Sequence, residues 1–179
     1  LLPLIGEPDA ALAALETYRD RFPAALDERL NAKLGLGPVR DGDRAQAEAL
    51  LRLLAAEHTD WTIFWRRFCA FDPGGENAAL RDLFVDRAAF DAWAHGFAAH
   101  LQATGRRPDA AIARRSNPAY VLRNHLAEQA IRRAQEKDFS EVERLRTLLS
   151  SPYEEQPGCE ADADFPPDWA STLEVSCSS

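Results

Sequence analysis

The sequence predicts an all-α protein with an irregular, multi-helix arrangement. Apolar residues recur at i, i+3, i+4 and i+7 along nearly every periodic stretch, which is the spacing of one helix face. No stretch before the C-terminal segment alternates apolar and polar residues as a half-buried strand would. Glycine, proline and capping residues separate the periodic stretches, so we expect several helices and no internal repeat.

The first predicted helix is the longest. It should begin near Asp9, directly after Pro8, and end at Gly35. Pro23 lies within its pattern and cannot donate a backbone hydrogen bond, so we expect a bend there or a division into two helices. The side chains expected to face inward are Leu12, Leu15, Tyr18, Phe22, Leu26 and Leu30.

Aspartates mark the starts of three further helices. Asp43, Asp60 and Asp86 each precede an apolar-periodic stretch and can cap its free N–H groups. The "DPGG" turn at 72–75 precedes a short helix, and Gly105 ends the helix that Asp86 begins. The side chains expected to face inward are Ala47, Leu50, Leu51 and Leu54; Trp61, Phe64, Trp65 and Phe68; Leu80, Leu83 and Phe84; and Phe90, Trp93, Phe97 and Leu101.

Two more helices are predicted in the C-terminal third. In "RSNPAYVLRNHLAEQAI", Asn117 should cap a helix that starts at Pro118, where the missing N–H costs nothing. Ser140 and Glu143 have the spacing of a capping box for the last helix, which should end at Ser151, before a proline. Their expected apolar faces are Val121, Leu122, Leu126, Ala130 and Ile131, and Val142, Leu145, Leu148 and Leu149.

A change in composition divides the chain into a helical region, 1–152, and an acidic, proline-containing tail, 153–179. Tyr153–Asp168 holds six acids and no base, so we expect an extended tail without a core of its own. Residues 106–146 instead carry ten Lys or Arg against six acids. We hypothesise that the tail lies over this basic stretch; a solvated basic face beside a loose tail is the alternative.

Composition also limits the function classes. The net charge of -8 argues against nucleic acid or an anionic membrane as the main partner. No apolar run is long enough to span a bilayer, and no signal peptide is visible. The chain contains no methionine, so we expect a fragment or a processed product. Three cysteines without C-x-x-C spacing favour a reducing compartment, the cytoplasm.

No catalytic, nucleotide-binding or metal-binding motif is visible. The glycine clusters "GLGP" and "DPGG" match neither dinucleotide nor P-loop patterns. The histidines are scattered along the chain, and no nucleophile elbow is present. We therefore expect no catalytic, cofactor-binding or metal-binding residue in this chain. Cys177, in the terminal "LEVSCSS", is the side chain whose reactivity suggests a role.

Five stretches, in this order, resemble the C-terminal part of the selenoprotein O family: "KLGL", "TDWTIFWRRF", "NPAYVLRNHLAEQAI", "SSPYEEQPG" and the terminal "PPDWASTLEVSCSS". Members of this family are protein adenylyltransferases with a pseudokinase fold. The resemblance covers essentially the whole chain. It implies a full-length enzyme that uses ATP and magnesium, or manganese, to transfer AMP to serine, threonine and tyrosine hydroxyls of other proteins. The nucleotide-binding core would lie upstream, so this chain alone is predicted to be inactive and to bind neither ATP nor metal.

The resemblance also gives Cys177 a role. Cysteine or selenocysteine occupies this position in the family, which implies a redox-active thiol that pairs with a cysteine of the kinase-like core. Cys159 is an alternative partner within the chain. The implied partners are the upstream core and protein substrates, without nucleic acid or membrane. A non-enzymatic helical interaction module remains the alternative, and a thiol redox protein in its own right is disfavoured by the acidic neighbours Asp168 and Glu174.

Overall fold

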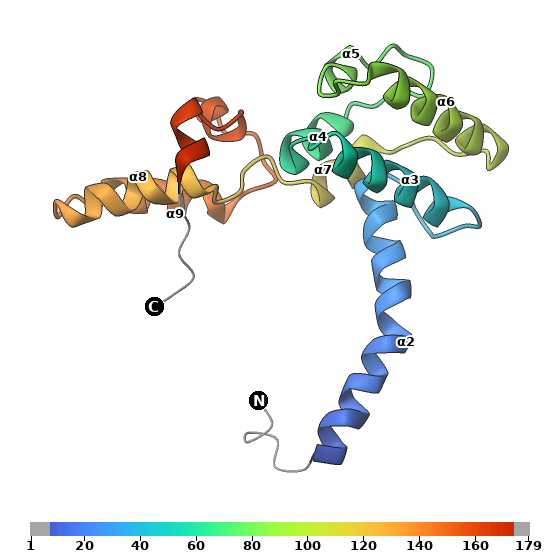
Figure 1. Cartoon of the computed structure of the whole chain (residues 1–179), viewed down its shortest axis with the longest axis horizontal. Coiled ribbons are helices and arrows are strands. Elements are labelled where there is room, and N and C mark those ends of the chain that lie inside the picture. Colours follow the sequence, from blue (N-terminus) through green and yellow to red (C-terminus); the bar gives the residue numbers. More distant parts are fainter. Residues whose placement is uncertain (1–7, 174–179) are drawn as a thin grey trace.

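A computed structural model describes residues 8–173 (Figure 1). This part of the chain contains α-helices, two 3₁₀ helices and loops but no strand, which confirms the all-α prediction for it. None of its helices is both long and apolar enough to cross a bilayer. The elements are α2 (Pro8–Lys33), α3 (Asp43–Ala56), α4 (Trp61–Phe68), α5 (Ala78–Arg81), α6 (Arg87–Ala103), α7 (Ala110–Ser116), α8 (Asn124–Gln135), α9 (Ser140–Ser150), η1 (Glu160–Ala163) and η2 (Asp168–Thr172).

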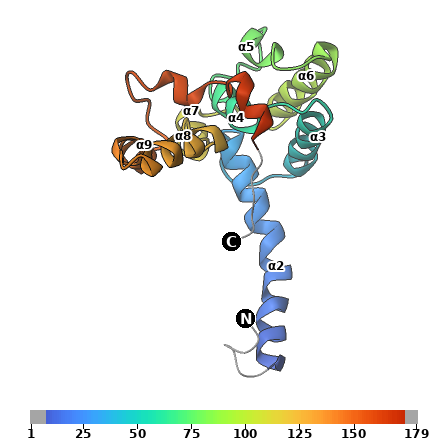
Figure 2. The ribbon, with the colours of Figure 1, turned by 60° about the vertical axis from the view of Figure 1, so that its left-hand side comes forward.

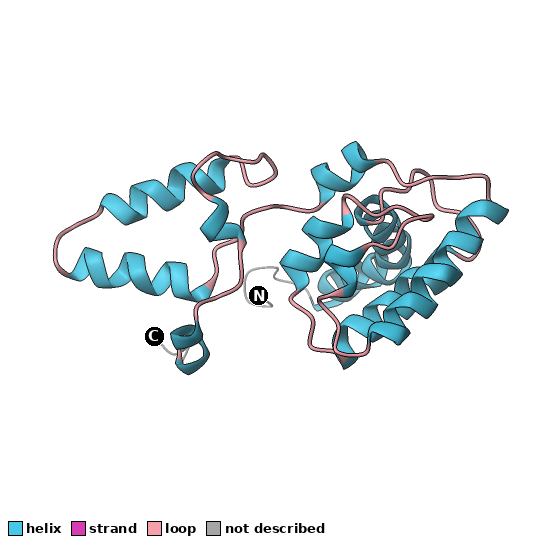
Figure 3. Ribbon diagram, turned by 90° about the horizontal axis from the view of Figure 1, so that it is seen from above, coloured by secondary structure: helices cyan, strands magenta, loops and turns pink. Residues whose placement is uncertain are grey.

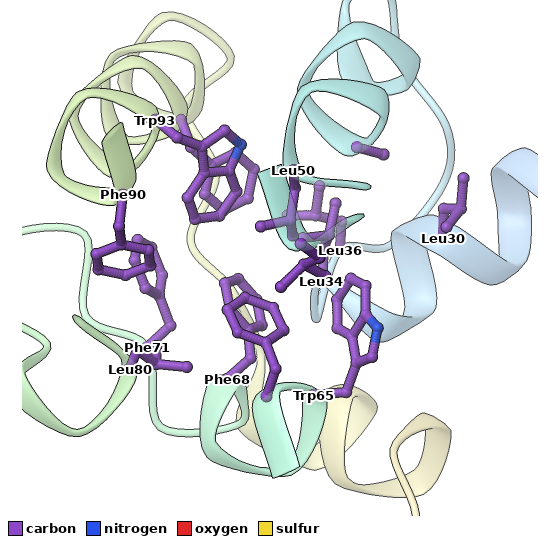
Figure 4. Packing of buried hydrophobic residues seen from close by; sticks show 14 of the residues in the cluster. Leu30, Leu34, Leu36, Leu50, Trp65, Phe68, Phe71, Leu80, Phe90 and Trp93 are labelled. Atoms are coloured by element: carbon purple, nitrogen blue, oxygen red, sulfur yellow. The ribbon is translucent and has the colours of Figure 1, made fainter. Parts of the chain in front are cut away.

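The main apolar core joins the C-terminal end of α2 to α3, α4, α5 and α6 (Figure 4). Aromatic rings dominate it: Phe68 stacks on Phe71 at 4.9 Å between centroids, and Trp93 stacks on Phe97 at 5.2 Å. Such pairs add to the free energy gained from apolar burial. The predicted inward faces of α4 and α6 are confirmed, apart from Trp61, which is half-exposed.

A second, smaller core lies between α8 and α9. These two helices pair as an antiparallel hairpin to one side of the other helices (Figure 3). Leu126 and Ala130 of α8 and Leu145 and Leu148 of α9 are buried there. Leu122, Ile131 and Val142, which were expected to face inward, are exposed. The hairpin is too small to enclose the whole apolar face of either helix.

The first part of the predicted tail packs on this hairpin and is not extended. Cys159 and Ala163 lie against the second core. Arg144 binds the buried Asp162 with an N–O distance of 2.7 Å, which is a contact of the kind hypothesised between the basic stretch and the tail. The backbone N–H of Gln156 donates to the Tyr120 hydroxyl at 3.0 Å. The division of the chain at residue 152 stays a prediction.

Local signals set several helix ends correctly. Asp60 accepts a hydrogen bond from Ile63 N at 2.9 Å, and Asp86 accepts one from Ala89 N at 3.0 Å, so both caps are confirmed. Gly35 follows the end of α2 with φ 70°, a backbone conformation that favours glycine. There, Asp109 N donates to Gly35 O at 2.8 Å.

Two predicted helix caps are wrong. Asn117 ends α7, a helix that was not predicted, and α8 begins only at Asn124, because Ala119 N instead donates to Pro152 O at 2.8 Å. Asp43 is the first residue of α3 and faces inward, so its carboxylate does not cap the helix.

The predicted capping box of α9 is also absent. Ser140 N donates to Asp138 Oδ1 at 2.9 Å, and Glu143 pairs with Arg146 one turn along the helix. The backbone N–H groups of Ser140 and Glu143, which a capping box would satisfy, donate to Asp138 Oδ1 and Phe139 O instead.

Of the two alternatives expected at Pro23, a division into two helices is wrong, and a bend stays a prediction. The helix α2 runs through Pro23, because the position is exposed and water can satisfy the carbonyl that loses its donor. The predicted inward face of α2 is wrong for its N-terminal part. Its N-terminal two-thirds extends away from the other helices (Figure 2), so Leu12, Leu15, Tyr18 and Phe22 are exposed. Leu30 is buried in the main core, and Leu26 packs against it.

Candidate functional site

Of the two predicted redox residues, Cys177 and Cys159, the structure describes only Cys159. Cys177 lies outside the described residues, so its pairing stays a prediction. Cys159 is half-buried at the start of η1 and packs on the second core. Cys159 and Cys69 are free thiols and are not joined to each other.

Cys69 belongs to a polar junction of α2, α4 and α7 that the sequence did not reveal. Its thiol is buried, lies 3.4 Å from Trp65 O, and is 3.6 Å from Asn117 Nδ2. Asn117 also donates to Lys33 O at 2.9 Å and accepts from Lys33 Nζ at 3.1 Å. Burial lowers the pKa of Lys33, and the nearby Cys69 opposes this effect. These groups satisfy one another, so the junction ties α2, α4 and α7 together.

A buried ionic cluster is centred on Asp43, whose side chain is fully buried. Asn31 Nδ2 donates to its carboxylate at 2.7 Å, and the backbone N–H of Arg40 donates at 2.8 Å. His100 Nε2 lies 2.8 Å from Asp43 Oδ1, and Arg106 binds both carboxylate oxygens. Burial alone would raise the pKa of Asp43. The hydrogen bonds from Arg106, His100 and Asn31 outweigh burial and hold this pKa well below its ordinary value.

An ion pair connects the two cores. Arg123, just before α8, binds Asp60 at the start of α4 through two hydrogen bonds of 2.7 and 3.0 Å. Asp60 therefore caps α4 and holds the hairpin at the same time. Burial would raise the pKa of Asp60, but the bonds from Arg123 and Ile63 lower it. The geometry is that of a bidentate, charge-assisted pair, which fixes orientation.

The exposed apolar side chains of α2 form the chain's most unusual surface. Leu12, Leu15, Tyr18 and Phe22 are between 44 and 64% exposed, and Tyr18 stacks on Phe22 at 5.0 Å. We call these four residues the α2 stripe. A helix that leaves such a stripe in water gains little from folding, since most helical stability comes from packing an apolar face. The α2 stripe therefore has the character of an interface.

The described residues offer no set of ligands for a metal ion. Between Pro8 and Leu173, no three His, Cys, Asp or Glu side chains gather in a way that could hold one. Asp43 and Asp60, two carboxylates whose pKa values are lowered, are already bound by arginines. Both carboxylates therefore already have cationic partners within the chain.

Comparison with known protein families identifies the family of this chain. The profile of the family described as "Protein adenylyltransferase SelO" matches residues 2–150. The chain belongs to the SelO family. It is 54% identical over its whole length to the "Protein nucleotidyltransferase YdiU" of Variovorax paradoxus, and 50% and 51% identical to the proteins of that name from Albidiferax ferrireducens and Paraburkholderia xenovorans.

The chain spans only 36–38% of the length of these relatives. More than three-fifths of each relative therefore has no counterpart in this SelO-family chain. Its described residues form two helical cores, a buried ionic cluster and an exposed apolar stripe. The sequence could not reveal the ionic cluster, because the partners of Asp43 on α6 and beyond lie 57 and 63 positions away.

Proposed function

We propose that the full-length protein is a protein adenylyltransferase that transfers AMP from ATP to serine, threonine or tyrosine hydroxyls of other proteins. In such a step a hydroxyl oxygen bonds to the α-phosphorus of ATP, pyrophosphate leaves, and the hydroxyl proton is lost. Membership of the SelO family carries this proposal, together with relatives named as protein nucleotidyltransferases. ATP and magnesium, or manganese, would be bound by the remainder of the protein, as the family resemblance implies.

We further propose that residues 1–179 support the kinase-like core and carry its terminal thiol. The α2 stripe is the surface we assign to this contact, and its occupant is the remainder of the same polypeptide. Relatives are nearly three times as long as this chain, so a full-length protein of that size would supply a large covalently linked partner. A linked partner binds at high effective concentration and can cover a stripe that would be too small for a stable intermolecular contact.

The remaining assignments also follow from the family resemblance. Cys177 would form a disulfide with a cysteine of the core, or with Cys159, by thiol–disulfide exchange with a small-molecule disulfide that is reduced to two thiols, and this pairing would tune activity. Free thiols at Cys69 and Cys159 are compatible with the cytoplasm. A non-enzymatic helical interaction module is the second candidate, and the exposed α2 stripe is the observation that favours it.

A labelling assay separates the two candidates. We expect the full-length protein, given ATP with labelled adenylate and magnesium, to modify protein hydroxyls. We expect residues 1–179 alone to transfer nothing and to show no micromolar ATP binding in calorimetry. Labelling by residues 1–179 would contradict the supporting role, and an inactive full-length protein would favour the interaction module.

A further inference from the structure

Residues 118–173 form a unit beside the main core, and we call this unit the arm. It contains the α8–α9 hairpin, η1 and η2, and the chain passes into it from α7 at Asn117 (Figure 3). Among the described residues, the buried apolar side chains of the arm and those of the main core form two separate clusters. A shared apolar core therefore does not hold the arm in place.

Polar contacts attach the arm instead. In the part of the chain that the structure describes, its hydrogen bonds to the main core involve two arginines. Arg66 of α4 donates to Tyr153 O at 3.3 Å and to Glu155 Oε1 at 3.2 Å. Arg123 of the arm binds Asp60, the cap of α4, through two hydrogen bonds. Both attachments thus converge on one short helix of the main core.

Arg66 lies at the base of the arm. Besides Tyr153 O, its guanidinium binds Asn117 O at 3.2 Å, so one side chain holds the segment that enters the arm and the segment that follows α9. These two segments also bond to each other, since Ala119 N donates to Pro152 O at 2.8 Å. Arg66 therefore fixes the position of both segments on α4.

The contact at the base of the arm is loosely packed. A hollow of about 350 Å³ lies there, and most of its lining residues, among them Tyr120 and Gln156, belong to the arm, whereas Arg66 belongs to α4. A further contact places the Arg67 guanidinium 5.8 Å from the centre of the Phe165 ring, which is half-exposed. Polar, loosely packed contacts are typical of parts of a chain that move relative to one another.

The pair of Arg123 and Asp60 is the stronger of the two attachments. Their side chains are only 12% and 19% exposed, and the contact is bidentate, so water and salt screen it little. In the other attachment, Glu155 is largely exposed and contributes little, which leaves the carbonyl contacts of Arg66 as its main part.

We propose that the arm is a movable element, which Arg66 and the Arg123–Asp60 pair hold against α4 and which swings away as a folded unit when these contacts break. The second core and the contact of Arg144 with Asp162 lie wholly within the arm and survive the movement. Release of a part that is held by polar contacts requires no unfolding, as in hinge motions of domains.

The hinge of this movement lies directly after Asn117. Asn117 stays with the main core, because its side chain donates to Lys33 O at 2.9 Å. Ala119 moves with the arm, because it is bonded to Pro152. The proposal concerns residues of this chain and does not depend on the adenylyl transfer proposed for the full-length protein.

Electron paramagnetic resonance on the full-length protein measures the position of the arm. Spin labels attached through non-canonical amino acids at Ala55 of α3 and Gln135 of α8, both exposed, report the distance between the main core and the arm. We expect one narrow distance distribution for the labelled parent. Arg66→Gln/Arg123→Gln should add longer distances, and the ratio of detached to attached arm should rise about 100-fold, because hydrogen bonds to charged groups are lost at both attachments.

Two further variants test the pair and provide the control. Asp60→Asn keeps the cap of α4, because asparagine caps as well as aspartate, and should shift the distribution in the same direction as Arg123→Gln alone. Arg146→Gln removes the same charge from an exposed position within the arm and should leave the distribution unchanged.

The proposal fails if Arg66→Gln/Arg123→Gln, with the helix content of the parent by circular dichroism, keeps the narrow distribution. Loss of helix content in that variant would also contradict it, since the arm would then not move as a folded unit. A labelled parent with a distribution as broad as that of the variant would show that these contacts do not hold the arm.

Discussion

Replacing Asp43 by alanine should lower the free energy of unfolding by about 3–5 kcal/mol, because breaking a buried ion pair leaves an uncompensated charge. The guanidinium of Arg106 is nearly buried and would lose both carboxylate oxygens that it binds. Asn31 and the backbone of Arg40 would each lose an acceptor as well. Urea unfolding of the wild type and the variant measures the difference. Asp41→Ala, an exposed acid two positions away, should change it by less than about 0.5 kcal/mol.

The pH dependence gives an independent check on Asp43. Its pKa is lowered in the folded protein, so ionised Asp43 stabilises the fold at any pH above its unfolded pKa of about 3.9. That contribution is lost as pH falls through the folded pKa. The stability difference between wild type and Asp43→Asn should therefore stay constant near neutral pH and shrink below about pH 4. A difference that persists unchanged in acid would show that the charge of Asp43 is not its source.

Phe68→Ala should destabilise the protein by about 3–5 kcal/mol through the cavity it leaves. The Phe68 ring is buried at the centre of the main core, where five other aromatic rings lie within 6.2 Å between centroids. Phe139→Ala removes the same ring from a 60% exposed position and should cost less than about 1 kcal/mol. Equal losses in the two variants, measured by thermal unfolding, would contradict the placement of the core.

The sequence predicts the helices best where the deciding contacts are local. Asp60 and Asp86 each accept a hydrogen bond from the backbone N–H three residues ahead. The aromatic rings of α4 and α6 recur at helical spacing. Such features require only neighbouring residues, so spacing and capping chemistry are sufficient.

Prediction fails where a side chain has a distant partner. Asn117 has the sequence of a helix start, but it ends α7 and bonds to Lys33, 84 positions away. Asp43 has the sequence of a cap, but it binds Arg106, 63 positions away. In both cases a tertiary contact overrides a local preference, and no spacing rule reveals it.

The candidate functional features show the same limit. The helical period of the α2 stripe was visible, but period alone cannot tell whether a core within the chain or a separate surface covers it. Cys177, the residue singled out by sequence, lies outside the described residues, so its role still rests on resemblance.

Hydrogen exchange along α2 tests the supporting role most directly. The backbone amides of residues 12–22 should exchange slowly in the full-length protein, where the remainder of the polypeptide covers the α2 stripe, and much faster in residues 1–179 alone. Leu15→Asp should restore fast exchange in the full-length protein, whereas Arg19→Ala should not. Equally fast exchange of these amides in the full-length protein and in residues 1–179 would contradict the contact and the supporting role built on it.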